Sequence, residues 1–155
     1  MAYEFKLKRL VEFAETDMVG MVHYSNFFRY MEAAEHAFFR SLGFSIVTNQ
    51  LEPPVGWPRV HAECDYKQPL FFEDEIEIQM LVSEKKSKSL SYVFRFFKLN
   101  ASPPIEVARG SLTVVCVTRQ DGKMRATTIP KTIADKIELA SHELLHSTSK
   151  FSNDE

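Results

Sequence analysis

The alternation of apolar and polar positions predicts a strand near the N-terminus. Between Leu7 and Phe13 the apolar residues fall roughly at every second position, as a half-buried strand requires. The polar cluster Glu15-Thr16-Asp17 interrupts this pattern, and Gly20 allows the chain to turn soon afterwards. We therefore expect one strand followed by a polar loop.

A helical pattern follows the loop, between Phe27 and Leu42. Apolar residues recur there at spacings of three and four, which predicts a largely buried helix: Phe27, Phe28, Met31, Ala34, Phe38 and Leu42. Ser25 or Asn26 can accept hydrogen bonds from the first free N–H groups of this helix. Gly43 can adopt the left-handed conformation that ends it. The helix is therefore marked at both ends.

The next 60 or so residues follow the period-two pattern of strands, after a Pro-rich loop at residues 53–56. Four strands are predicted, near residues 60–67, 76–82, 90–96 and 105–118. Polar, Pro or Gly residues separate them, as expected between antiparallel neighbours, at residues 85–89, 101–104 and 121–122. We expect a meander.

A short amphipathic helix is predicted after Pro130, which suits a first helical turn. Its apolar face would consist of Ile133, Ile137, Ala140 and Leu144. We expect a single domain over residues 1–146 and a disordered polar tail over residues 147–155. The element order is that of an α+β fold in which one sheet buries its apolar face against the long helix. The sheet edges would then be covered by a second subunit.

Composition narrows the classes of protein further. The chain has 155 residues, of which 45% are hydrophobic and 26% charged, as in one globular domain. It has no run of about 18 apolar residues and no apolar leader, so we expect a cytoplasmic protein without a membrane span. A net charge of -2 disfavours nonspecific binding to nucleic acid. Cys64 and Cys116 lie far apart and are expected to be buried hydrophobic residues rather than a disulfide or a metal site.

One segment carries a specific motif, the stretch VEFAETDMVGMVHYSNF at residues 11–27. It resembles the signature of the 4-hydroxybenzoyl-CoA thioesterase family of hot-dog proteins, in which an acidic residue in a D-x-x-G-x-V-x-Y-x-N-[FY] segment precedes the central helix. DYKQP at residues 65–69, followed by Asp74, resembles the second-strand pattern of that family. The resemblance extends from Leu7 to about Leu145. It implies a curved antiparallel sheet wrapped around a long central helix, a homodimer or homotetramer, and an acyl-CoA thioesterase without a cofactor.

Asp17 is the candidate catalytic residue. It precedes the N-terminus of the predicted helix, where free N–H groups and the positive end of the helix dipole could stabilise an oxyanion. The resemblance implies that the N–H of Tyr24 is the oxyanion donor and that Gly20 lets the loop approach the substrate. Asp17 would then attack the thioester or activate water, and both routes stay open. His23 could orient water, contact the acyl group or simply pack.

Other residues are weaker candidates for substrate contact. Asn26 fits a helix start as well as a substrate contact. Glu32 could touch the far end of the acyl group, or be a solvated or ion-paired side chain. Glu35 is a further acidic residue of the helix, and another hot-dog clade uses a helix glutamate for catalysis, but the acid in the motif of this chain is Asp17. Four further side chains could line an acyl pocket or belong to the core: Phe27, Phe28, Met31 and Trp57.

The phosphates of coenzyme A would need basic side chains at the entrance of the site. Lys85, Lys86 and Lys88 cluster in the turn between two predicted strands, where the related enzymes place phosphate-contacting residues. Lys123 with Arg125 forms a second candidate group. A solvated turn rich in lysine is an equally good interpretation of any single one of them.

The sequence also contains a competing motif, because His142-Glu143-Leu144-Leu145-His146 matches the H-E-x-x-H zinc signature. Only residues 147–155 follow it, which leaves little chain for a third ligand and a cleft, so no resident metal is expected. A zinc hydrolase is therefore the least favoured alternative. A hot-dog protein that only binds acyl-CoA is the main one. A hydratase would need an Asp and His pair in another arrangement than Asp17 and His23.

Overall fold

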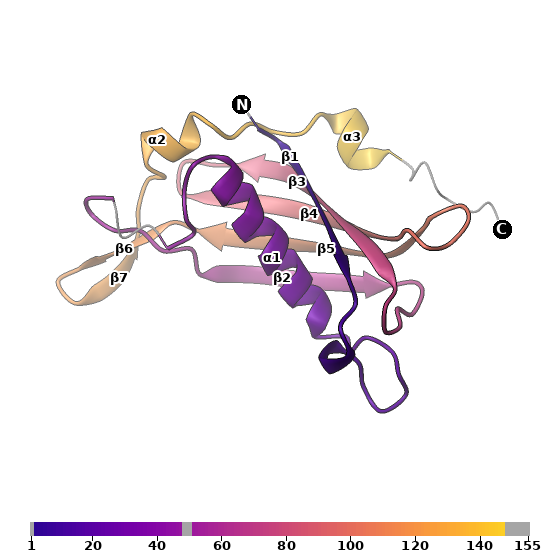
Figure 1. Cartoon of the computed structure of the whole chain (residues 1–155). Helices are drawn as coiled ribbons and strands as arrows, with labels where there is room; N and C mark the ends of the chain where they lie inside the picture. The colour runs from indigo at the N-terminus through magenta and orange to yellow at the C-terminus, as the bar shows by residue number, and fades with distance from the viewer. Residues whose placement is uncertain (1, 48–50, 148–155) are drawn as a thin grey trace.

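The computed structural model describes residues 2–47 and 51–147. Within them, one antiparallel sheet carries a long helix across one face (Figure 1). The sheet order is β1-β3-β4-β5-β2. Its strands are β1 (Glu4–Leu10), β2 (Arg59–Tyr66), β3 (Glu75–Lys85), β4 (Ser89–Lys98) and β5 (Ile105–Val115). The predicted α+β arrangement of a sheet around a central helix is confirmed.

The central helix α1 spans Asn26–Ser41 and lies across the sheet, with its closest backbone neighbours on β1, β3 and β2. Its buried face meets alternate residues of β3, β4 and β5, which form the core: Ile76, Ile78, Met80, Leu90, Tyr92, Phe94, Phe96, Leu112 and Val114. Each large apolar side chain buried in this way contributes about 1.5–3 kcal/mol. Gly43 has φ of 89°, so its predicted role in ending the helix is confirmed. Ser25 precedes the helix, but its side chain does not cap it.

The predicted four-strand meander is correct for three strands and wrong for the first. β3, β4 and β5 are consecutive neighbours, whereas β2 pairs with β5 and β1 pairs with β3. Both edge strands therefore come from the segments that flank α1 in the sequence. Period-two patterning predicts that a segment is a strand, but it does not determine which neighbour the strand pairs with.

The predicted first and fourth strands end earlier than expected. Phe13 lies in η1 (Phe13–Glu15), one turn of 3₁₀ helix, so the alternation beyond Leu10 does not continue the strand. The fourth strand is divided at Cys116, after which β6 (Val117–Gln120) and β7 (Lys123–Ala126) form a separate hairpin. Asp121 and Gly122 at its tip have positive φ, which permits the tight turn.

The predicted terminal helix is replaced by two short helices, α2 (Lys131–Ala134) and α3 (His142–His146). These helices and the chain between them are held to the sheet by polar contacts that a periodicity argument does not include. Lys85 Nζ donates to the carbonyl oxygens of Ala134 and Ile137 at 2.7 and 2.8 Å. Buried Arg95, on the sheet face opposite α1, donates to the carbonyl oxygens of Leu144 and Leu145 at 3.4 and 3.1 Å.

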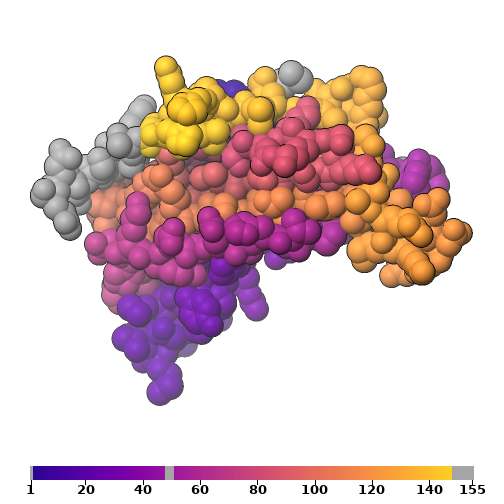
Figure 2. Space-filling view, turned by 180° about the vertical axis from the view of Figure 1, so that it is seen from behind, coloured from indigo at the N-terminus to yellow at the C-terminus, as the bar shows by residue number. Residues whose placement is uncertain are grey.

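Figure 2 shows this C-terminal segment at the upper rim of the sheet, seen from the side opposite α1. Residues 148–155 of the predicted tail lie outside the described residues. Among the helices that the structure describes, none is both long enough and apolar enough to span a bilayer.

Candidate active site

Asp17 lies in the loop that joins η1 to α1, and its carboxylate is held on one side only. Oδ1 accepts hydrogen bonds from the N–H groups of Val19 at 2.9 Å and Met21 at 3.2 Å. Oδ2 accepts none from the part of the chain that the structure describes. Gly20 has φ of 91° at the turn of this loop, a conformation that favours glycine. The loop therefore fixes the orientation of the carboxylate and leaves one oxygen available.

Glu15 is the main anchor of this loop, a role that the sequence analysis missed. Its Oε2 forms an ion pair with Arg9 at 2.7 Å, and its Oε1 accepts a hydrogen bond from the Tyr30 hydroxyl at 3.1 Å. Its carbonyl oxygen accepts from the N–H of His23 at 2.9 Å and from Asn26 Nδ2 at 2.7 Å. Burial and the neighbouring Glu15 raise the pKa of Tyr30, so its hydroxyl remains a donor.

A second anchor comes from the segment between β2 and β3. The N–H of Val22 donates to the carbonyl of Leu70 at 2.8 Å, and Met21 forms a bridge with Phe71. Asp74, which is buried, accepts a hydrogen bond from the N–H of Phe71 at 2.7 Å. The Asp17 loop is thus fastened to the sheet on both sides, which supports a preorganised site.

Asp17 lies in a cleft of about 350 Å³ at the N-terminus of α1. The walls come from the Asp17 loop, α1 and the end of β2: Asp17, Met21, Val22, Tyr24, Phe27, Tyr66, Lys67, Gln68, Pro69 and Leu70. Within residues 2–47 and 51–147, no hydrogen-bond acceptor is found for the N–H of Tyr24. The cleft therefore combines a carboxylate, a residue with an unused N–H donor and apolar walls.

Three of the predicted site residues lie beside this cleft rather than in its wall. His23 is exposed, and its Nδ1 lies 2.7 Å from Ser25 Oγ. Asn26 is buried and supports the loop through Glu15. Gly20 shapes the loop but is not a lining residue. Phe27, in contrast, lines the cleft and is also buried in the core, so both of its expected roles stay open.

Glu32 and Glu35 on α1 have different surroundings. Glu32 is exposed and lies 3.6 Å from His36 Nε2. Glu35 is fully buried, and its Oε1 accepts a hydrogen bond from Arg59 Nη2 at 2.6 Å. Burial raises the pKa of Glu35 and the Arg59 guanidinium opposes that rise. Neither glutamate lines the Asp17 cleft.

The other side chains considered for an acyl pocket belong to the core. Met31 is fully buried and packs so closely on Gly110 that a Cβ there would lie 2.1 Å from the Met31 methyl group. Trp57 is buried, with its ring 5.5 Å from that of Phe39. Phe28 is partly buried and packs against the core.

The predicted phosphate-binding lysines lie at the far end of the sheet. Lys85 ends β3, and Lys86 and Lys88 lie in the β3–β4 turn. The Asp17 loop lies near the start of β3, which is roughly 30 Å away at the usual rise per strand residue (Figure 1). Lys85 holds the C-terminal segment, and Lys86 lies 2.7 Å from Glu84. Lys88 is exposed. The basic residue in the wall of the Asp17 cleft is instead Lys67.

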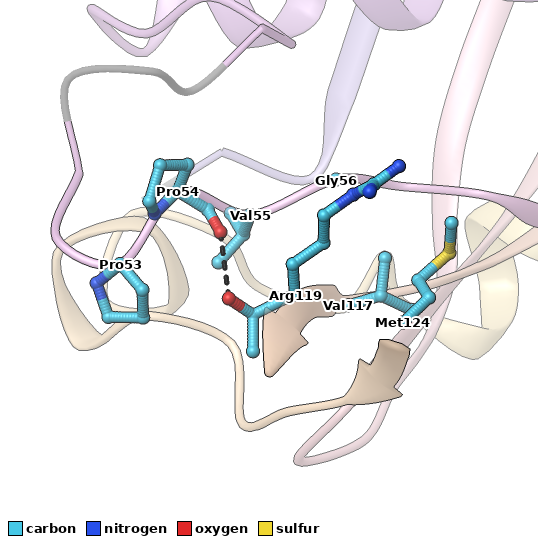
Figure 3. Close-up of a pocket in the computed structure, with 8 residues that line it drawn as sticks. Pro53, Pro54, Val55, Gly56, Val117, Arg119 and Met124 are labelled. Atoms are coloured by element: carbon cyan, nitrogen blue, oxygen red, sulfur yellow. Dashed lines mark hydrogen bonds between the residues drawn. The ribbon is translucent and has the colours of Figure 1, made fainter. Parts of the chain in front are cut away.

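A second hollow, of about 310 Å³, lies under the β6–β7 hairpin (Figure 3). Pro53, Pro54 and Val55 form one side and β6 with Met124 the other. Thr118 Oγ1 donates to the carbonyl of Pro54 at 3.0 Å across it. Among the described residues, its lining contains no carboxylate, histidine or cysteine, so the Thr118 hydroxyl there has no base beside it to activate it for hydrolysis.

The zinc-like motif forms α3, where the rings of His142 and His146 lie 4.2 Å apart. In the described ranges, no group of three or more His, Cys, Asp or Glu side chains is placed to hold a metal ion. The motif therefore supplies a histidine pair without the third protein ligand of a catalytic zinc site.

Comparison with known proteins relates this architecture to one family. The profile of the thioesterase-like superfamily matches residues 11–137, which include the Asp17 loop, α1 and β2 to β5. A putative esterase of Aquifex aeolicus is 34% identical over 131 residues, which cover 84% of this chain and 95% of that protein. A 1,4-dihydroxy-2-naphthoyl-CoA hydrolase of Prochlorococcus marinus is 38% identical over 104 residues, 61% of this chain and 64% of that protein. The fold is also similar to the structure of 4-hydroxybenzoyl-CoA thioesterase from Pseudomonas sp. strain CBS-3, with a TM-score of 0.79 at 20% sequence identity. The matched region covers 87% of this chain and 99% of that protein chain.

Proposed function

Because the chain belongs to the thioesterase-like superfamily of hot-dog enzymes, we propose that it hydrolyses the thioester of an acyl- or aroyl-coenzyme A in the Asp17 cleft. The observation that carries this proposal is the pairing of two groups in one cleft. The Asp17 carboxylate has an available oxygen, and Tyr24 has an N–H without a partner in the described part of the chain. Thioester hydrolysis needs one group of each kind.

Two routes fit these groups. In the first, Asp17 takes a proton from water as the water oxygen bonds to the thioester carbon. The carbonyl oxygen gains negative charge, which the N–H of Tyr24 and the N-terminus of α1 stabilise. The C–S bond then breaks, and the thiolate of coenzyme A takes a proton and leaves with the acid product. In the second route, the Asp17 carboxylate displaces the thiolate, and water hydrolyses the resulting anhydride.

The acyl group is proposed from the relatives. One acts on 1,4-dihydroxy-2-naphthoyl-CoA and a structural neighbour acts on 4-hydroxybenzoyl-CoA. Aroyl-CoA thioesters are therefore the first substrates to assay. The half-exposed ring of Tyr66 in the cleft wall supports this choice, because it can pack on an aryl group, whereas the Phe27 ring behind it is buried.

We further propose a homodimer or a homotetramer. β2 is an edge strand, and Val60 and Tyr66 on it are 62% and 46% exposed, which supports coverage by a second subunit. Lys85, Lys86 and Lys88 lie at the opposite end of β3 from the Asp17 loop of their own chain, roughly 30 Å away at the usual rise per strand residue, which favours contact with a coenzyme A bound in another subunit. If they bind its phosphates, they do so for another subunit. Light scattering at several concentrations tests the assembly.

Thiol release from a panel of short, long and aromatic acyl-CoA substrates tests the function. We expect wild type to cleave at least one of them and Asp17→Asn to lose most of the rate, with EDTA without effect. Asp65→Asn is the matched control, because Asp65 is exposed on β2 and does not line the cleft. Cleavage of no thioester would favour a protein that only binds acyl-CoA, and equal rates for Asp17→Asn and wild type would show that Asp17 is not the catalyst. Inhibition by EDTA would favour the zinc alternative at His142, Glu143 and His146.

A further inference from the structure

We infer that the Tyr66 hydroxyl is a positioning group, which ties the segment carrying the Tyr24 N–H to the end of β2 and so fixes that donor relative to Asp17. This inference rests on the proposed function. It adds a residue to the site that does not itself touch the reacting atoms. Tyr66 belongs to the DYKQP segment at residues 65–69, and no role is predicted for it from the sequence alone.

The contact joins two distant parts of the chain. The Tyr66 hydroxyl donates to the carbonyl oxygen of Tyr24 at 3.0 Å. The Tyr66 ring meets the ring of Phe27 edge to face, with centroids 5.0 Å apart and an angle of 83° between the planes. Ring and hydroxyl together lie in the wall of the Asp17 cleft. The end of β2 is therefore attached directly to the start of α1.

Apart from a ring contact with His23, in which the two centroids lie 4.5 Å apart, few contacts hold Tyr24. Its carbonyl accepts one other hydrogen bond, a long one of 3.4 Å from the N–H of Phe27. Its N–H has no acceptor within the described ranges, and its side chain is 63% exposed. The neighbouring His23 is held through its N–H to Glu15. The Tyr66 hydroxyl therefore makes the shorter of the two hydrogen bonds to the Tyr24 carbonyl.

The hydroxyl is suited to this role because it remains protonated. Burial, together with the neighbouring Cys64 and Tyr24, raises the pKa of Tyr66 to about 12. A carbonyl oxygen only accepts hydrogen bonds, so Tyr66 must be the donor. The tether therefore persists throughout the neutral pH range.

Loss of the tether should affect the transition state more than the bound substrate. An oxyanion donor contributes most when it is held at the position where charge develops, and a displacement of about 1 Å can cost about 100-fold in rate. We expect Tyr66→Phe to lower kcat by roughly 10- to 100-fold and to leave KM within about threefold. The phenylalanine keeps the ring that packs on Phe27, so the wall of the cleft is preserved.

The test compares Tyr66→Phe with Tyr92→Phe on the fastest thioester of the panel. The Tyr92 hydroxyl is buried and has no partner among the described residues, so its removal should leave kcat unchanged. If Tyr66→Phe lowers thermal stability, kcat is measured well below its unfolding midpoint. A rise in KM with an unchanged kcat would overturn the inference, as would a Tyr66→Phe enzyme that matches wild type.

A spectroscopic measurement reads the donor directly. A thioester with a ¹³C-labelled carbonyl is bound to Asp17→Asn protein, with and without Tyr66→Phe. We expect the carbonyl stretch to move to higher frequency when the tether is removed, because the hydrogen bond to the oxygen weakens. An unchanged frequency would overturn the inference. If Asp17→Asn retains the full rate, the proposed function and this inference both fail. If Asp17→Asn loses the rate but Tyr66→Phe retains it, the inference fails and the proposed function is supported.

Discussion

Two carboxylates, one in the loop before α1 and one within the helix, have similar hydrogen-bonding patterns and opposite surroundings. Asp17, before the helix, and Glu35, within it, each have one bonded oxygen and one without a partner in the described part of the chain. Asp17 is half-buried in the wall of a cleft and is held by two neutral N–H groups. Glu35 is fully buried and is held by the positive charge of Arg59.

This difference separates a group placed for chemistry from a group placed for structure. Neutral donors orient a carboxylate without neutralising it, and the open cleft lets a substrate reach the free oxygen. An ion pair compensates a buried charge, but the paired carboxylate is then engaged by its partner and is not available to a substrate. The Glu35 pair is about 14 Å along the helix from Asn26, at the usual helical rise. The presence of an acidic residue in a helix is therefore weak evidence of a catalytic role unless a cleft gives the substrate access to it.

The largest contrast should appear in activity. We expect Asp17→Asn to reduce kcat by about 10²- to 10⁴-fold, the usual contribution of a general base, with little change in thermal stability. Glu35→Gln should keep kcat within a few fold, because Glu35 does not line the cleft. Thiol-release kinetics and thermal unfolding of both variants provide the comparison. Equal losses of activity in the two variants would remove the distinction.

For the free energy of unfolding, we expect the surroundings of Glu35 to matter more than those of Asp17. Arg59→Met leaves the fully buried Glu35 carboxylate without its partner, which should lower the free energy of unfolding by about 3–5 kcal/mol. The double change Arg59→Met with Glu35→Leu should recover much of that loss, because no buried charge remains. Urea unfolding measures both. A single variant as stable as wild type would show that the ion pair is not structural.

The pH dependence of stability sharpens the role of Glu35. Its pKa is raised in the folded protein by burial, although Arg59 opposes the rise, so the folded state retains this proton to higher pH than the unfolded state. The contribution of Glu35 to stability is then full below its unfolded pKa of about 4.3 and declines as pH rises through its folded pKa. Glu35→Gln should remove this decline. Unfolding curves from pH 4 upward, compared with Glu32→Gln as an exposed control, would show it.

The sequence predicted the site better where local signals were complete. The motif at residues 17–27 predicted a loop with an acid before a buried helix, and the structure has both. The strand faces of β3 and β4 followed from period-two alternation. Strand order did not follow, because edge pairing depends on contacts between residues distant in sequence. The terminal helix failed for a similar reason, since the carbonyl groups there are bound by Lys85 and Arg95.

The supporting residues of the cleft were also beyond the sequence. Glu15 was visible only as part of a polar cluster, and its contacts to Arg9, Tyr30 and Asn26 join three separate elements. Lys67 belongs to the DYKQP segment, and only the fold brings it to the Asp17 cleft. Such residues are identified only from their contacts in the folded chain, which a periodic sequence pattern does not predict.

The smallest expected effect concerns the anchor rather than the acid. Tyr30→Phe removes the hydrogen bond from the Tyr30 hydroxyl to Glu15 Oε1, and we expect a loss of about 1 kcal/mol in the free energy of unfolding. Glu15 keeps its ion pair with Arg9 and its bonds to the loop, so kcat should fall by no more than a few fold. Tyr66→Phe, which acts on the other side of the loop, should instead lower kcat more than it lowers the free energy of unfolding. A Tyr30→Phe enzyme with a large loss of kcat and unchanged stability would mean that the Glu15 side controls the oxyanion donor.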